Sequence, residues 1–222
     1  MRGGSIRALV LTLGMAACGT SCARDHASDG GPSDATTQDG GSDADRLERE
    51  AEFWRMVAVC GTPVEEFPTI SEMAEAADAA VVGRIVSASK GKTVQGDAAE
   101  DFYAEVNLRI EVDEVLRHSA PSSFDLSLIL TTVGTSTALA SAIDTLQARL
   151  PQERIVLLVR SRSDLGTDDL YRLVNDQGLW ATTTRGALDN PVTDKCHWIE
   201  AASNPFLEGV LSLDELIEHL GD

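Results

Sequence analysis

Residues 102–116 alternate between apolar and polar side chains more regularly than any other part of the chain. The apolar set is Val106, Leu108, Ile110 and Val112, and the polar set is Glu105, Asn107, Arg109, Glu111 and Asp113. Because successive side chains of a β-strand point to opposite faces, this period of two predicts a strand with one buried and one solvent-facing side. We therefore expect the apolar set to face a core, and Arg109, Glu111 and Asp113 to face solvent.

Three further segments have the composition of strands, with many β-branched and aliphatic residues. These segments are 79–89, 124–132 and 154–160. Gly83 lies inside the first of them and predicts a β-bulge or a sharp bend. Residues 90–101 are polar and predict a hairpin loop. Residues 171–174 and 179–182 predict a short hairpin around residues 175–178.

Helices are predicted at both ends of this strand-rich region and within it. The segments are 46–59, 70–77, 134–150 and 213–220. The first places Leu47, Phe53, Trp54 and Val57 near one face. Thr69 precedes the second helix with Glu72 three residues later, which is the spacing of a capping box. Ser212 is the expected N-cap of the last helix.

The order of these segments resembles that of a set of exported bacterial proteins of unknown function. The matching stretches are 77–85, 112–118 and 152–159. Their hydrophobic pattern is similar to that of the netrin-like module of metalloprotease inhibitors, an OB-type barrel. The resemblance implies an α+β fold, with a five-stranded OB-like (netrin-like) β-barrel flanked by N- and C-terminal helices. His118 stands where the pattern usually has glycine, and residues 134–150 resemble an insertion.

The N-terminus resembles the signal sequence of a bacterial lipoprotein. Arg2 and Arg7 precede a short apolar run, and Met15, Ala16 and Ala17 lead into Cys18. The run is shorter than the roughly 20 residues that a membrane-spanning helix needs. The resemblance implies lipidation of Cys18 after removal of residues 1–17. The alternatives are cleavage by an ordinary signal peptidase, lipidation of Cys22 after a poorer upstream match, and a chance resemblance.

Residues 18–45 are expected to form a disordered acidic tether. Residues 24–45 contain six aspartates and one arginine, and no aliphatic side chain larger than alanine. Such a segment buries too little apolar surface to offset the entropy lost on ordering. The tether would hold a single globular domain, residues 46–222, away from the membrane. The resemblance therefore implies an exported protein of the bacterial cell envelope, lipid-anchored at the outer membrane or the cell surface.

The formal net charge of −18 limits the classes of partner. Nucleic acid is disfavoured because its phosphates would be repelled. Electrostatic adhesion to anionic lipid heads is disfavoured for the same reason. The expected partners are the membrane, through lipid on Cys18, and an envelope protein.

Cys60 and Cys196 are the two cysteines of the expected domain. Cysteines of exported domains commonly pair because their compartment is oxidising, so we predict a disulfide between them. The alternative is a pair of buried free thiols.

Motifs that would indicate catalysis or metal binding fail on spacing or context. Ser87 and Lys90 match S-x-x-K, but the match ends a predicted strand and lacks the partner motifs of penicillin-recognising enzymes. The histidines are His26, His118, His197 and His219, and none has zinc-ligand spacing. We assign no catalytic, cofactor-binding or metal-binding residue. The expected function is a non-catalytic binding or interaction module, and the alternatives are an enzyme with a dispersed active site and a protease-inhibitor-like module.

Overall fold

Five strands pair in a closed ring in the computed structural model of the chain. The structure describes residues 43–58, 65–95, 102–130, 136–163, 166, 169–182, 188–192 and 205–221. These residues belong to one unit, Gly40–Asp222. Cys18, Cys22, Cys60 and Cys196 lie outside the described residues, so the lipidation and the disulfide remain predictions. The fold is a mixture of helices and strands, as expected from the sequence.

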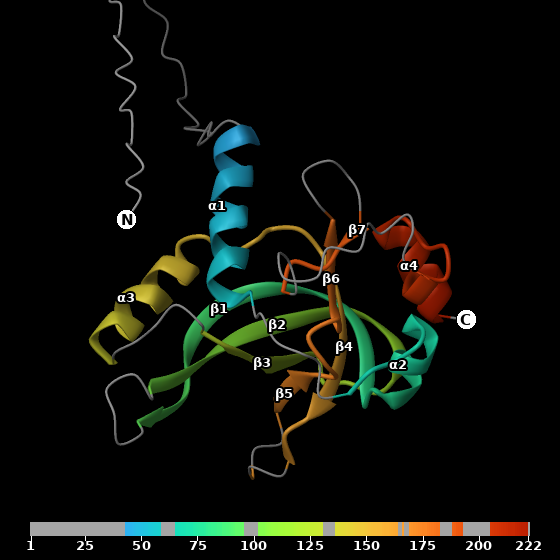
Figure 1. The fold of residues 1–222 in the computed structure, drawn as a ribbon, viewed down its shortest axis with the longest axis horizontal. Coiled ribbons are helices and arrows are strands. Elements are labelled where there is room, and N and C mark those ends of the chain that lie inside the picture. Colours follow the sequence, from blue (N-terminus) through green and yellow to red (C-terminus); the bar gives the residue numbers. More distant parts are fainter. Residues whose placement is uncertain are drawn as a thin grey trace, which may run out of the picture. The chain divides into compact units, whose positions relative to one another are not determined.

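The ring is formed by strands in the order β1-β2-β3-β5-β4, and β4 returns to pair with β1. The strands are β1 (Ala79–Gln95), β2 (Phe102–His118), β3 (Ser123–Ile129), β4 (Ile155–Ser161) and β5 (Leu170–Leu173). β3 and β5 are parallel, and the other pairs in the ring are antiparallel. β6 (Leu179–Thr182) and β7 (Leu188–Asp189) extend the sheet from β4 (Figure 1).

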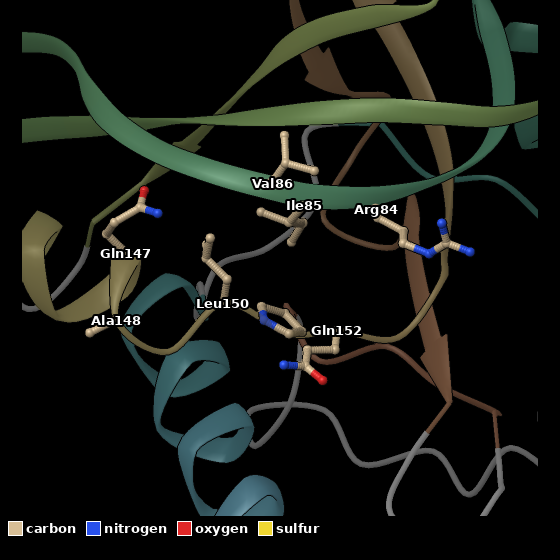
Figure 2. A pocket seen from close by; sticks show the side chains of 8 residues that line it. Arg84, Ile85, Val86, Gln147, Ala148, Leu150 and Gln152 are labelled. Atoms are coloured by element: carbon tan, nitrogen blue, oxygen red, sulfur yellow. The ribbon is translucent and has the colours of Figure 1, made fainter. Parts of the chain in front are cut away.

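The pairing of β1 is irregular at Gly83, which agrees with the β-bulge predicted there from the sequence. Its register with β2 shifts between Val82 and Gly83. A Cβ atom on Gly83 would lie 2.5 Å from the carbonyl oxygen of Glu111, so only glycine fits this close approach. The pairing of β1 with β4 also ends at Gly83. Beyond that point a cleft opens between β1 and residues 147–152 (Figure 2).

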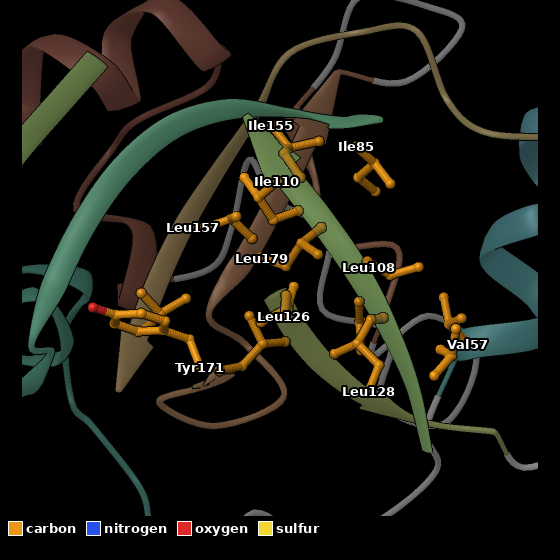
Figure 3. Packing of buried hydrophobic residues seen from close by; sticks show 14 of the residues in the cluster. Val57, Ile85, Leu108, Ile110, Leu126, Leu128, Ile155, Leu157, Tyr171 and Leu179 are labelled. Carbon is orange, nitrogen blue, oxygen red and sulfur yellow. The ribbon is translucent and has the colours of Figure 1, made fainter. Parts of the chain in front are cut away.

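The interior of the ring holds the main hydrophobic core, and the alternation in β2 sets its position. Val106, Leu108 and Ile110 are fully buried, whereas Val112 is only half-buried near the strand end. Leu126, Leu157 and Leu179 meet them from β3, β4 and β6 (Figure 3). The helices α1 (Asp43–Val57) and α3 (Ser136–Gln147) add four buried side chains to the same core. These are Phe53, Val57, Leu139 and Leu146.

A second core covers the opposite side of β1 and β4. Ala80, Val82, Val156 and Leu158 point away from the ring interior and contact the helices α2 (Ile70–Ala76) and α4 (Leu213–Gly221). The short 3-10 helix η3 (Pro205–Leu207) joins this layer. α2 and α4 lie side by side on this side of the sheet (Figure 1). The near-continuous apolar run of β4 follows from burial on both of its faces.

The predicted helix caps are present. The Thr69 hydroxyl group accepts a hydrogen bond from the backbone N–H of Glu72. Ser212 accepts one from the N–H of Glu215, whose carboxylate accepts the N–H of Ser212 in return. Both pairs satisfy backbone donors that the first turn of a helix leaves free.

The hairpin predicted around residues 175–178 is wrong. β5 and β6 both pair with β4, through Val159–Leu173 and Leu157–Leu179, and the described residues show no pairing between the two strands. β5 and β6 lie end to end along one edge of β4, and residues 174–178 form the loop that connects them. The composition of residues 175–178 is that of a turn, but whether the flanking strands pair with each other or with β4 depends on tertiary structure.

Candidate binding face on strands β2 and β3

The outward side of β2 and β3 carries two clusters of hydrogen-bonded polar side chains. We call it the β2–β3 outer face and define it as Tyr103, Glu105, Asn107, Arg109, Ser123, Asp125, Ser127 and Ile129. The register places Glu105 opposite Ile129, Asn107 opposite Ser127, and Arg109 opposite Asp125. Because Val106, Leu108 and Ile110 face the ring interior, alternation directs this set outward.

Glu105 is buried although it lies on the outward side of its strand, with 6% of its surface exposed. Its Oε1 accepts a hydrogen bond from the Tyr103 hydroxyl group at 2.8 Å, and its Oε2 accepts one from Ser127 at 2.9 Å. The Nη1 atom of Arg162, which follows β4, lies 4.0 Å from Oε1. A carboxylate withdrawn from water is costly unless it is paired and hydrogen-bonded, and these three side chains provide that compensation.

Tyr103 is a permanent donor in this cluster. Burial, followed by the hydrogen bond to Glu105, raises the pKa of Tyr103 to about 12. The hydroxyl group therefore stays protonated over the whole physiological range and keeps the carboxylate oriented.

A second polar cluster organises the other end of the same face. Arg109 donates to Asp125 at 3.4 Å and to Ser123 at 2.5 Å. Both charged side chains are more than a third exposed, so the pair adds little stability. Its effect is to hold the guanidinium in a defined position across β2 and β3.

Apolar groups lie beside the buried carboxylate. Tyr103 and Ile129 are each 36% exposed, and Val94 on β1 pairs directly with Tyr103. Cross-strand neighbours share a face of the sheet, so Val94, Tyr103 and Ile129 flank Glu105. An exposed tyrosine beside aliphatic side chains is typical of a surface that binds another molecule.

The alternation in the sequence places Glu105 on the polar side of its strand, but no sequence motif marks this residue as part of a site. Burial of this carboxylate depends on Ser127 and Arg162, which come from other strands and give no local signal. Ser87 and Lys90 lie on β1, so the S-x-x-K match lacks the helix that its chemistry needs.

A serine, a histidine and a carboxylate meet between α2 and α4, and this cluster was not found from the sequence. Ser71 donates to Oε2 of Glu208 at 2.7 Å, and its Oγ lies 2.9 Å from Nε2 of His219. The same carboxylate oxygen lies 3.3 Å from Nε2 and accepts the backbone N–H of Ser71. In a catalytic triad the carboxylate holds Nδ1 and leaves Nε2 free to take the serine proton. Here the carboxylate of Glu208 instead contacts the serine and Nε2, so the arrangement differs from a triad, and its hydrogen bonds link α2 to α4.

Within the described residues, no group of three or more His, Cys, Asp or Glu side chains is arranged to hold a metal ion. None of the described helices has the length and apolar character needed to cross a membrane.

Comparison of the chain with protein-family models, curated proteins and solved structures finds no match.

Proposed function

We propose that this chain is a lipid-anchored protein of the bacterial cell envelope whose domain is a non-catalytic binding module, and that the β2–β3 outer face is its binding surface. The observation that carries the proposal is the burial of Glu105 on the outward side of β2. The carboxylate of Glu105 does not pack in the ring interior. Its contacts with Tyr103, Ser127 and Arg162 hold these side chains in fixed positions on the outer face. Such preorganisation reduces the entropy that binding would otherwise cost.

We further propose that the ring is an OB-like, netrin-like barrel. The strand order, the parallel pair β3–β5 and the position of α3 between β3 and β4 support this assignment. His118 adds a second line of support. It has a φ of 61°, a left-handed conformation that favours glycine, and glycine is what the resembling pattern has at this position. In OB-folds the face of strands 2 and 3 is the usual ligand surface, which agrees with the face proposed here.

A protein is the partner that fits this face best. The net charge of −18 opposes the polyanionic ligands that OB-folds often bind. Tyr103 and Ile129 offer apolar area beside satisfied hydrogen-bonding groups, which is the usual composition of a protein interface. Lipid on Cys18 would keep the domain near envelope partners.

The proposal is tested by chemical cross-linking in intact cells that express the full chain. We compare Tyr103→Ala with Val115→Ala as a matched control, because Val115 is also an exposed β2 side chain but lies outside the face. Tyr103→Ala should remove a discrete cross-linked species that the wild type and Val115→Ala retain. A wild type without such a species, or a species insensitive to Tyr103→Ala, would contradict the proposal.

A further inference from the structure

β1 has an edge that no strand covers. β4 pairs with β1 from Ala79–Val159 to Gly83–Ile155 and no further. On its other side, β1 pairs with β2 as far as Gln95. Among the described residues, therefore, the edge of β1 that faces away from β2 has no strand partner beyond Gly83. Such an edge presents backbone N–H and C=O groups that can pair with another chain.

One side chain already occupies part of this edge. Oε1 of Gln147, at the end of α3, accepts the backbone N–H of Ala88 at 2.8 Å. Ala88 is the register partner of Leu108 on β2. Its N–H nevertheless points away from β2 and donates to Gln147. A glutamine oxygen thus takes the position that a strand carbonyl would have. The backbone N–H of Ala88 is therefore directed away from β2, toward the side of the cleft that Gln147 lines.

The cleft beside this edge has the size of a ligand site. Its volume is about 410 Å³, and it is lined by Arg84, Ile85 and Val86 from β1 and by residues 147–152. Figure 2 shows the β1 side chains on one side of the space, with Gln147, Leu150 and Gln152 on the other. The volume lies in the range of pockets that hold small ligands or short segments, roughly 300–1,000 Å³.

The lining favours an uncharged occupant. Ile85, Leu150 and Pro151 form an apolar floor, and Gln147 and Gln152 carry neutral amides. Arg84 is the charged group of this lining, and its Nη1 already pairs with Asp113 at 3.2 Å.

We propose that this cleft binds an uncharged, extended peptide segment of a partner protein, which adds to β1 as a strand from Arg84 onward. The segment would continue the line of β4, whose pairing with β1 stops at Gly83. Backbone hydrogen bonds to the edge would provide affinity, and alternate side chains of the segment would contact the apolar floor. The site is separate from the β2–β3 outer face and does not depend on it.

The test uses a random heptapeptide library displayed on phage and selected on the full chain. The best binder is synthesised with a fluorophore, and its affinity is measured by anisotropy. Gln152→Trp would fill the cleft from an exposed position, and Val115→Trp is the control at an exposed position outside it. Gln152→Trp should weaken binding about tenfold or more, the loss of one or two backbone hydrogen bonds, and Val115→Trp should leave it unchanged.

N-methylation of the peptide distinguishes a strand from other ligands. Methyl groups on alternate backbone nitrogens should abolish binding in one register and leave it in the other, because alternate amides of a strand point to opposite sides. Equal effects in both registers would indicate a side-chain pocket for small molecules and overturn the proposal. Failure of the library to yield a binder, or a binder unaffected by Gln152→Trp, would overturn it as well. Tyr103→Ala should not change the affinity, which keeps this result distinct from that for the β2–β3 outer face.

Discussion

The Tyr103 hydroxyl group donates a 2.8 Å hydrogen bond to Oε1 of Glu105, two residues further along β2. Residues i and i+2 of a strand lie on the same face, so the tyrosine covers the carboxylate that it orients. Ser127 holds the second carboxylate oxygen from the neighbouring strand. The hydrogen bonds of Glu105 therefore join two strands on the outside of the ring.

Removal of this carboxylate should destabilise the fold. Glu105→Ala leaves the buried hydroxyl group of Ser127 without this acceptor and removes the carboxylate beside Arg162, and we expect a loss of about 2–3 kcal/mol in the free energy of unfolding. Glu111→Ala is the control, because Glu111 is an exposed glutamate on the same side of β2, and it should change stability by less than about 0.5 kcal/mol. Urea denaturation at pH 7 measures both. Equal effects would show that the burial of Glu105 has no energetic consequence.

The two sides of β2 should respond differently to truncation. Ile110 is fully buried in the ring interior, and Ile110→Ala should cost about 2–5 kcal/mol through lost burial and a cavity. Arg109→Ala removes only a half-exposed ion pair with Asp125 and should cost less than about 1 kcal/mol. Chemical denaturation provides the comparison. A larger loss of stability for Arg109→Ala than for Ile110→Ala would contradict the assignment of the buried and exposed faces of β2.

Acid should weaken the contact between α2 and α4. The hydrogen bond from Ser71, more than the neighbouring His219, lowers the pKa of Glu208 below its usual value of 4.5. A carboxylate with a lowered folded-state pKa contributes stability above its unfolded pKa, and this contribution is lost as pH falls through the folded value.

Ser71→Ala tests this linkage. The variant should be less stable than the wild type at pH 7, and the difference should shrink as the pH falls below 4.5. Unfolding midpoints measured from pH 7 to pH 2.5 give the profile. A difference that stays constant over this range would mean that Glu208 ionisation is not linked to the contact.

His118→Gly should stabilise the protein. His118 has a φ of 61°, and a side chain in the left-handed region costs about 1 kcal/mol or more. Glycine removes this cost but loses more entropy on folding, so the expected net gain is about 0.5–1 kcal/mol. His118→Ala keeps the Cβ atom and should give no gain. Thermal unfolding of the three proteins distinguishes these outcomes, and a destabilised His118→Gly would argue against backbone strain at this position.

Cys18→Ser should release the protein from the membrane fraction. The expectation rests on Arg2, Arg7 and the residues 15–17 before the cysteine. Cell fractionation followed by immunoblotting measures the distribution, and Cys22→Ser is the control. Unchanged partitioning of Cys18→Ser would rule out lipidation at this cysteine, and release of Cys22→Ser alone would move the anchor there.

Local patterns in the sequence determined much of the secondary structure. The period of two in β2 predicted which side of the strand faces the core, because a slip of one residue would expose Val106, Leu108 and Ile110. Gly83 predicted the bulge, and Thr69 and Ser212 predicted helix caps. Each of these depends on residues within a few positions of one another. Strand formation, glycine bends and helix caps are therefore readable without the fold.

Tertiary structure alone decided which distant side chains meet. Glu105 is buried because Ser127 and Arg162 reach it from other strands, and Ser71 meets Glu208 and His219 only after α2 and α4 pack on the same layer. The cleft exists because β4 stops pairing at Gly83 while β1 continues. Strand pairing and helix packing join residues far apart in the chain, and no local periodicity encodes such contacts. For this reason the sequence by itself predicted the alternating strand, whereas the candidate site on its outer side required the fold.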